Sequence, residues 1–239
     1  MAKKIYIIIG GKGGVGKTMV SKSLTEHLLE QGENVLAIDA DCANPGLHKT
    51  FERHDGHETE YPAKLVVHTF NLAQVEGWSA LITLCADLPD YTVVIDTPAG
   101  SHESIRQFAA ILQSCLGELD RDWCSLFVVS GQRDSVELLA DYLEMTPRTH
   151  VVHALLNGFF GDARSFERFQ RSKTRLEVLA RRGTIASFPA LAAHIVNAID
   201  WDRLPFTQAA RQYALGHRAV LTPWLNEVRA TLLQVRSAA

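Results

Sequence analysis

The sequence predicts an α/β protein built on a doubly wound, mostly parallel sheet with helices on both faces. Short apolar runs alternate along the chain with longer segments of helical period. Several runs are apolar throughout, which is typical of strands covered on both faces. Strands linked by helices need right-handed crossovers, which place helices on both sides of the sheet. The expected strands cover residues 5–9, 35–38, 65–70, 93–95, 126–129, 151–156 and 184–188.

The segments between these runs have the spacing of helices. A chain of 239 residues can form one large domain or two small ones. No linker rich in proline, glycine or serine and no internal repeat divides it, so one domain over residues 1–239 is expected. A polar stretch from His48 to Tyr61 is expected to be an irregular surface loop. The expected helices cover residues 17–31, 73–87, 101–116, 135–144, 165–182, 190–199 and 223–236.

Composition excludes several classes of protein. A chain that is 46% hydrophobic and 21% charged is not disordered as a whole. The net charge of −3 gives no sign, over the whole chain, of a nucleic-acid binder. The apolar run at the amino terminus is too short for a signal peptide, and no run reaches the roughly 18 residues of a membrane span. The cysteines form no C-x-x-C pair and indicate reduced thiols in a cytoplasmic protein; they are Cys42, Cys85, Cys115 and Cys124.

A glycine-rich loop joins the first expected strand to the first expected helix. It is Gly11-Lys12-Gly13-Gly14-Val15-Gly16-Lys17-Thr18, and it fits G-x-x-x-x-G-K-[ST] in full. Glycines let successive N–H groups point at phosphate oxygens, and the helix N-terminus adds positive charge. We expect Lys17 to reach the β- and γ-phosphates and the Thr18 hydroxyl to ligate Mg²⁺. The alternative is a chance glycine-rich turn, but the strand-then-helix context favours the fold of a P-loop NTPase.

The second lysine of the loop, Lys12, is not needed to hold phosphates bound by its own loop. With it, the run from Lys12 to Thr18 resembles the K-G-G-x-G-K-[ST] mark of the deviant Walker A ATPases of the ParA/MinD type, in the CobQ/CobB/MinD/ParA superfamily. The resemblance implies a nucleotide-dependent homodimer in which Lys12 acts on the phosphates of the other subunit, as an arginine finger does. A solvated surface lysine is the alternative. Met19 departs from the family, where a second threonine often contacts the α-phosphate, so nucleotide affinity could differ.

Two aspartates follow the second expected strand. Ligands of doubly wound sheets bind at the carboxyl ends of the strands, and residues two apart on extended chain point the same way. Asp39 and Asp41 could therefore share one face beside Mg²⁺ and a terminal phosphate. The resemblance implies that Asp41 positions the hydrolytic water and that Asp39 belongs to the magnesium shell. Turn or helix capping is the alternative, and the chain after Asp41 departs from the D-P-Q of the family.

A third carboxylate, Asp96, ends another apolar run. The segment Asp96-Thr97-Pro98-Ala99-Gly100 matches the family pattern D-[TS]-P-x-G. Asp96 could hold Mg²⁺ through water, as a Walker B residue does; an ordinary turn is the alternative.

The base of the nucleotide has one candidate contact, Asn157, at the end of the sixth expected strand. Its amide could bond the adenine edge, although Asn157-Gly158 is also a good turn sequence. The N-K-x-D pattern of guanine sites is absent there, so ATP is expected in preference to GTP.

The segment from Arg164 to Arg182 carries seven basic and two acidic residues, a local excess of +5. It could contact DNA phosphates or an acidic partner, or it could be a solvated helix face. The last expected helix opens with Thr222-Pro223 and carries an apolar stripe of Trp224, Leu225, Val228, Leu232 and Val235. Its basic residues are few, so packing on the domain is expected and membrane binding is not. His54 and His57 lack companion ligands for a metal.

The distal half is similar to conjugal-transfer proteins of the TraL type. This likeness rests on Val129-Ser130-Gly131-Gln132, Leu155-Leu156-Asn157, Ser165-Phe166-Glu167, Phe188-Pro189-Ala190-Leu191 and the run from Leu204 to Ala209.

We therefore expect a Mg²⁺-dependent ATPase switch of slow, partner-stimulated turnover in plasmid partition or conjugal transfer. The alternative is a nucleotide-binding adaptor that does not hydrolyse ATP. A ligase with a P-loop is disfavoured by Lys12, and an iron–sulfur carrier by the dispersed cysteines.

Overall fold

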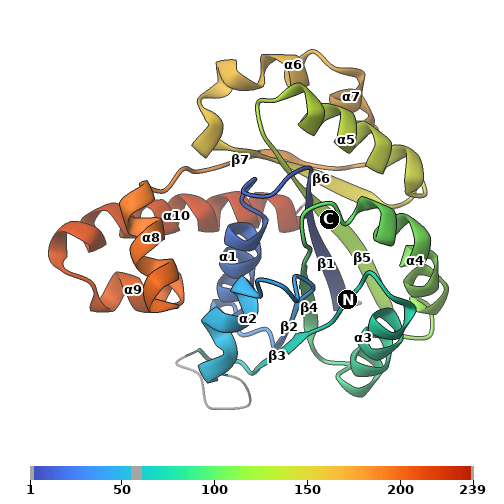
Figure 1. Ribbon diagram of the computed structural model, residues 1–239, viewed down its shortest axis with the longest axis horizontal. Helices are drawn as coiled ribbons and strands as arrows, with labels where there is room; N and C mark the ends of the chain where they lie inside the picture. The colour runs from blue at the N-terminus through green and yellow to red at the C-terminus, as the bar shows by residue number, and fades with distance from the viewer. Residues whose placement is uncertain (1–2, 55–60, 238–239) are drawn as a thin grey trace.

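A computed structural model of the chain describes residues 3–54 and 61–237. In this part of the chain, seven parallel strands form one sheet in the order β3-β2-β4-β1-β5-β6-β7 (Figure 1). Each strand expected from the sequence is present. The strands are β1 (Lys3–Gly10), β2 (Val35–Asp39), β3 (Leu65–Thr69), β4 (Thr92–Asp96), β5 (Arg121–Val129), β6 (Val151–Asn157) and β7 (Ile185–Phe188).

Helices cover both faces of the sheet, as the sequence predicts. On one face lie α1 (Lys17–Glu30), α2 (Gly46–Phe51), α8 (Ala193–Asp202), α9 (Phe206–Gln212) and α10 (Leu215–Ser237). On the other lie α3 (Val75–Asp87), α4 (His102–Cys115), α5 (Arg133–Met145), α6 (Glu167–Gln170) and α7 (Lys173–Ala180). Three 3₁₀ turns are also described: η1 (Glu52–His54), η2 (Gly158–Phe160) and η3 (Ala163–Phe166).

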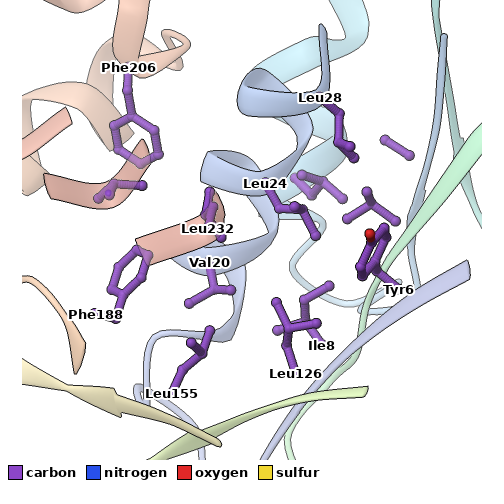
Figure 2. Close-up of a cluster of buried hydrophobic side chains, with 14 of the residues drawn as sticks. Tyr6, Ile8, Val20, Leu24, Leu28, Leu126, Leu155, Phe188, Phe206 and Leu232 are labelled. Carbon is purple, nitrogen blue, oxygen red and sulfur yellow. The ribbon is translucent and has the colours of Figure 1, made fainter. Parts of the chain in front are cut away.

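The side chains of β1 alternate between two hydrophobic cores. Tyr6 and Ile8 point into the core that α1 covers, whereas Ile7 and Ile9 belong to the core on the opposite face. Figure 2 shows Tyr6 and Ile8 near Leu24 of α1. Because alternate residues of a strand point to opposite faces, a strand between two helical layers must be apolar at nearly every position. This explains the unbroken apolar runs in the sequence.

The segment after His48, expected to be an irregular loop, begins with regular structure. It forms α2 and then the 3₁₀ turn η1 (Glu52–His54). An oxygen of the Asp39 carboxylate accepts hydrogen bonds from the backbone N–H groups of Leu47 (2.8 Å) and His48 (3.0 Å). Asp39 thus caps α2 from the end of β2, which a search for a cap beside the helix misses. His57 lies outside the described residues.

The expected single helix over residues 165–182 is divided into η3, α6 and α7. Ser172 separates the last two: its hydroxyl oxygen accepts a hydrogen bond from the Arg175 N–H at 3.1 Å and donates to the Phe169 carbonyl at 2.7 Å. The serine therefore ends one helix and starts the next, because a side chain that bonds the backbone locally competes with the helical pattern.

The last helix starts earlier than the sequence predicts. Thr222-Pro223 was expected to open it, but α10 begins at Leu215 and Pro223 lies inside it. Leu221 and Trp224, on either side of the proline, are both buried, and this packing outweighs the backbone hydrogen bond that proline removes. The expected apolar stripe does pack in the core with α1. No helix among the described residues is long and apolar enough to cross a membrane.

A buried carboxylate on α1 holds the short helix α9, which the sequence did not predict. Glu26 accepts hydrogen bonds from the N–H groups of Phe206 (2.6 Å) and Thr207 (2.8 Å) and from the Thr207 hydroxyl (2.7 Å). Arg229 of α10 adds two contacts with the Glu30 carboxylate, at 2.8 and 2.6 Å. The helix that follows the phosphate loop is therefore fastened to the carboxyl-terminal helices.

Candidate functional site

The glycine-rich loop lies where β1 ends, at the carboxyl edge of the sheet between β4 and β5. Gly14 and Gly16 have positive φ angles, +74° and +101°, which favour glycine. No backbone N–H group from Gly13 to Thr18 donates a hydrogen bond to any described residue. A loop of unpaired donors at a helix N-terminus fits a phosphate chain.

Lys17 supplies the positive charge inside this loop. It is 6% exposed, and its ammonium donates to the Lys12 carbonyl at 3.2 Å. Burial lowers the pKa of Lys17, while the charges of Asp96 and Asp41 oppose that change. A phosphate against the loop, which the sequence predicts, would offset the free-energy cost of burying this ammonium.

Lys12 is the other lysine of the loop, and it is exposed. Its ammonium forms an ion pair with Asp134 at the start of α5, at 2.6 Å. This hydrogen bond and charge hold the pKa of Asp134 below its ordinary value. Lys12 is therefore paired within the chain itself.

Asp96 lies beneath the loop with the first residues of α1. Its carboxylate accepts a hydrogen bond from the Ser21 hydroxyl at 2.9 Å. Burial raises the pKa of Asp96 to about 7 and the nearby Asp39 acts in the same direction, while Thr18, Ser21 and Lys17 oppose the change. Hydroxyl and carboxylate oxygens are the donors that Mg²⁺ prefers, so Thr18 and Asp96 fit the predicted magnesium site.

Asp39 and Asp41 differ in burial and in the groups that they contact. Asp39 is fully buried; besides capping α2, it accepts from the Asp41 N–H at 3.0 Å. Asp41 follows the end of β2, where its carboxylate accepts from the Asn44 N–H at 3.0 Å and lines a cavity beside Lys17. Both aspartates thus make capping contacts, as the alternative interpretation of the sequence expects. Only Asp41 is open to a ligand in the cavity.

The cavity has a volume of about 780 Å³, which is in the range of small-molecule sites. It extends from the loop residues Gly13 to Met19 toward α8, with an apolar wall formed by Phe159, Pro189 and Leu191. Loop residues, a cationic floor and an apolar wall suit a nucleotide, with phosphates at one end and a base at the other. Gly11 and Val15 line a smaller cavity of about 140 Å³ on the other side of the loop.

Asn157, expected to contact adenine, also holds the loop itself. Its amide nitrogen donates to the Val15 carbonyl at 2.8 Å, and its amide oxygen accepts from the Phe159 N–H at 3.0 Å. A Cβ atom at Gly16 would lie 2.5 Å from the Asn157 amide nitrogen, so the loop and β6 are in close contact. One N–H of the amide remains for a base.

Several lining residues were missed in the sequence. Lys22 of α1 is nearly buried and pairs with Asp200 of α8 at 2.9 Å, and both line the cavity with Asn197 and Arg203. The α8 positions follow helical spacing, but a sequence offers no signal that distinguishes them from a solvated helix face. Pro189 and Leu191 of the apolar wall follow β7 directly. They could have been predicted from the sequence, because the carboxyl ends of parallel strands meet at one edge of the sheet.

The segment from Arg164 to Arg182 contributes no residue to the cavity. One of its cations has a structural role instead. Arg181 is 8% exposed and donates to the carbonyl oxygens of Leu143 (2.6 Å) and Thr146 (3.2 Å), which end α5. Arg181 is therefore neither available to a partner nor part of a solvated helix face.

The described cysteines are dispersed, as expected. Cys85 and Cys124 are buried, whereas Cys42 is exposed. Within residues 3–54 and 61–237, no group of three or more histidine, cysteine or acidic residues could hold a metal ion.

A loop of unpaired N–H groups around a buried lysine, set between a parallel strand and a helix, defines the class of P-loop NTPases. A model of the ParA family, described as "NUBPL iron-transfer P-loop NTPase", matches residues 1–120, and the chain belongs to this family.

Two relatives match almost the full chain. Protein MobD of Acidithiobacillus ferrooxidans is 38% identical over 232 residues, covering 97% of each chain. Protein TraL of Escherichia coli is 27% identical over 225 residues, covering 89% of each. The fold matches that of the septum site-determining protein MinD from Pyrococcus horikoshii OT3, complexed with Mg-ADP. That match has a TM-score of 0.53 and 17% identity, over 95% of this chain and 96% of the other. The resemblance to ParA, MinD and TraL proteins is thereby confirmed.

Proposed function

We propose that the protein is an ATP-driven switch that acts in plasmid mobilisation or conjugal transfer. The observation that carries this proposal is the 780 Å³ cavity whose one end is the loop of unpaired N–H groups around the buried Lys17. The full-length similarity to MobD and TraL supports the setting.

In the proposed site, each part of the cavity has its own task. The loop N–H groups and Lys17 bind the triphosphate of ATP, and Met19 lies beside it. Thr18 and Asp96 hold Mg²⁺, with Asp39 behind them. The bound Mg²⁺ would offset the negative charge that develops on the phosphates. Asp41, beside Lys17, orients the attacking water, and Asn157 directs its remaining N–H to adenine.

Lys12 has its proposed task in a homodimer. Having left Asp134, it contacts the phosphates held by the second subunit, and this couples ATP binding to dimer formation. Hydrolysis returns the subunits to the separate state. The output is contact with DNA or with a protein of the transfer or partition machinery, through the segment from Arg164 to Arg182.

Phosphate release tests the hydrolytic part of this proposal. The informative variant is Asp41→Asn, because an asparagine oxygen can still accept from the Asn44 N–H and preserve the turn. We expect Mg-ATP binding to be retained while phosphate release falls about a hundredfold or more. Lys17→Ala should lose nucleotide binding itself. Equal phosphate release by wild type and Asp41→Asn would exclude the role of Asp41; binding without turnover in the wild type would favour the adaptor alternative.

Light scattering after size-exclusion chromatography, with and without ATP, tests the dimer. We expect a dimer of the wild type only with ATP, and none of Lys12→Ala. A monomer in every sample would exclude the sandwich arrangement, whatever the result for hydrolysis.

A further inference from the structure

The outward side of α7 carries two exposed leucines. Leu176 is 61% exposed and Leu179 is 44% exposed, and residues three apart on a helix are neighbours. On the inward side, Val178 is fully buried and packs in the core with Phe169. The core therefore fixes which side of α7 faces outward, and it leaves this leucine pair in solvent.

Cations without a carboxylate partner lie on α7 and on the segments that precede and follow it. Of the seven basic residues between Arg164 and Arg182, two are engaged: Arg171 with Glu167 at 2.6 Å, and Arg181 with Glu177 at 2.9 Å. Within the described chain, no carboxylate pairs with the other five; they are Arg164, Arg168, Lys173, Arg175 and Arg182. Because both acidic residues of the segment are used, the whole local excess of +5 is available to a partner.

We infer that this α7 surface, formed by Leu176 and Leu179 with the five unpaired cations, binds an acidic amphipathic segment of a partner protein. Apolar side chains of that segment cover the leucine pair, and its carboxylates meet the cations of α7 and of the adjoining segments. This segment would belong to the protein partner of the proposed function. Only the biological purpose of the contact rests on that function.

The leucine pair distinguishes this partner from DNA. Nucleic-acid backbones are bound by cations, and exposed leucines add nothing to phosphate contacts. Protein interfaces, in contrast, combine a small apolar centre with a polar rim, and arginine is enriched in them. A lipid surface fits less well, because α7 has only eight residues and its other side is committed to the core.

A synthetic peptide can stand for the partner. The probe is a fluorescein-labelled helix about five turns long, with leucine along one side and glutamate elsewhere. Its binding to the full-length protein is followed by fluorescence anisotropy at low salt. Three further probes are a peptide with serine in place of leucine, a duplex DNA of random sequence and phosphatidylglycerol vesicles.

Two double variants separate the apolar and the charged contributions. One is Leu176→Ser with Leu179→Ser, and the other is Lys173→Glu with Arg182→Glu. A matched control changes two exposed leucines of α10, Leu215→Ser with Leu233→Ser, which are 74% and 47% exposed in the wild type. Arg218→Glu, also on α10, is the charge control.

We expect the wild type to bind the leucine–glutamate peptide and each α7 double variant to bind it about tenfold more weakly. The α10 control variants should bind the leucine–glutamate peptide with an affinity within about twofold of wild type. The serine peptide should bind the wild type poorly. Binding of fluorescent ATP by the same samples shows separately whether the nucleotide switch is intact. The inference is overturned if the peptide does not bind, if the leucine variant binds it as the wild type does, or if DNA or vesicles bind more tightly and respond to the charge variant alone.

Discussion

Lys12 of the phosphate loop and Asp134 of α5 form an ion pair of 2.6 Å, although 122 residues separate them in the sequence. Both side chains are more than half exposed. In the proposed dimer Lys12 must reach the other subunit, so this pair has to open first. In the separate subunit, the ion pair with Asp134 therefore competes with dimer formation for Lys12.

Removing that competition should favour the dimer. We predict that Asp134→Asn strengthens ATP-dependent dimerisation about two- to fivefold at low salt, since exposed ion pairs are weak. High salt should remove the difference. The control is Glu137→Gln, which breaks another exposed ion pair of α5, with Arg133. Sedimentation with ATP measures the dimer; weaker association of Asp134→Asn than of wild type would contradict the competition.

Asn157→Asp should weaken nucleotide binding. The substitution places a carboxylate oxygen against the Val15 carbonyl, where the wild type has a donor at 2.8 Å. A buried acceptor that faces another acceptor costs about 1–3 kcal/mol, which corresponds to roughly tenfold or more in affinity. Asn197→Asp, in the same cavity, adds the same charge without touching the loop. Titration with a fluorescent ATP analogue compares the two; equal losses in both variants would mean that charge, and not loop support, sets the effect.

The buried Glu26 should make stability depend on pH. Burial raises its pKa from 4.5 to about 7, against the hydrogen bonds that favour the ionised form. A raised folded-state pKa contributes stability that is present below pH 4.5 and is lost as the pH rises through 7. Relative to Glu26→Gln, the wild type should therefore lose about 3 kcal/mol of unfolding free energy between pH 4.5 and 8. Urea unfolding at several pH values measures this, with the exposed Glu227→Gln as the control. A difference that does not change with pH would show that Glu26 has the same pKa in the folded and unfolded states.

Arg181 and Arg182 should differ in their effect on stability, although they are neighbours. Arg181→Met leaves the carbonyl oxygens at the end of α5 without their donor, and we expect a loss of about 2–4 kcal/mol. Arg182 is exposed, so Arg182→Ala should change the unfolding free energy by no more than about 0.5 kcal/mol. Chemical denaturation of both variants gives the comparison. Similar losses would mean that the carbonyl contacts of Arg181 contribute little.

Much of the fold follows from patterns that are local in the sequence. Each of the seven strands was predicted, because a strand buried on both faces must be apolar along its length. The helices that were missed or misplaced depend on partners outside the helix itself. Asp39 caps α2 from the end of β2, only eight residues before Leu47. Glu26 caps α9 from α1, 180 positions away, and core packing carries α10 through Pro223, so no short window of sequence contains what stabilises these two helices.

The candidate site divides in the same way. By itself, the sequence determined the phosphate loop, since glycines, a lysine and a threonine at fixed spacing need only a strand before them and a helix after them to meet a phosphate chain. The tertiary structure alone decided what the surrounding polar groups contact: Asn157 bonds the loop and Lys12 pairs with Asp134. The physical reason is that a polar side chain takes whichever partner the folded chain brings within hydrogen-bonding distance, and residues far away in the sequence supply those partners.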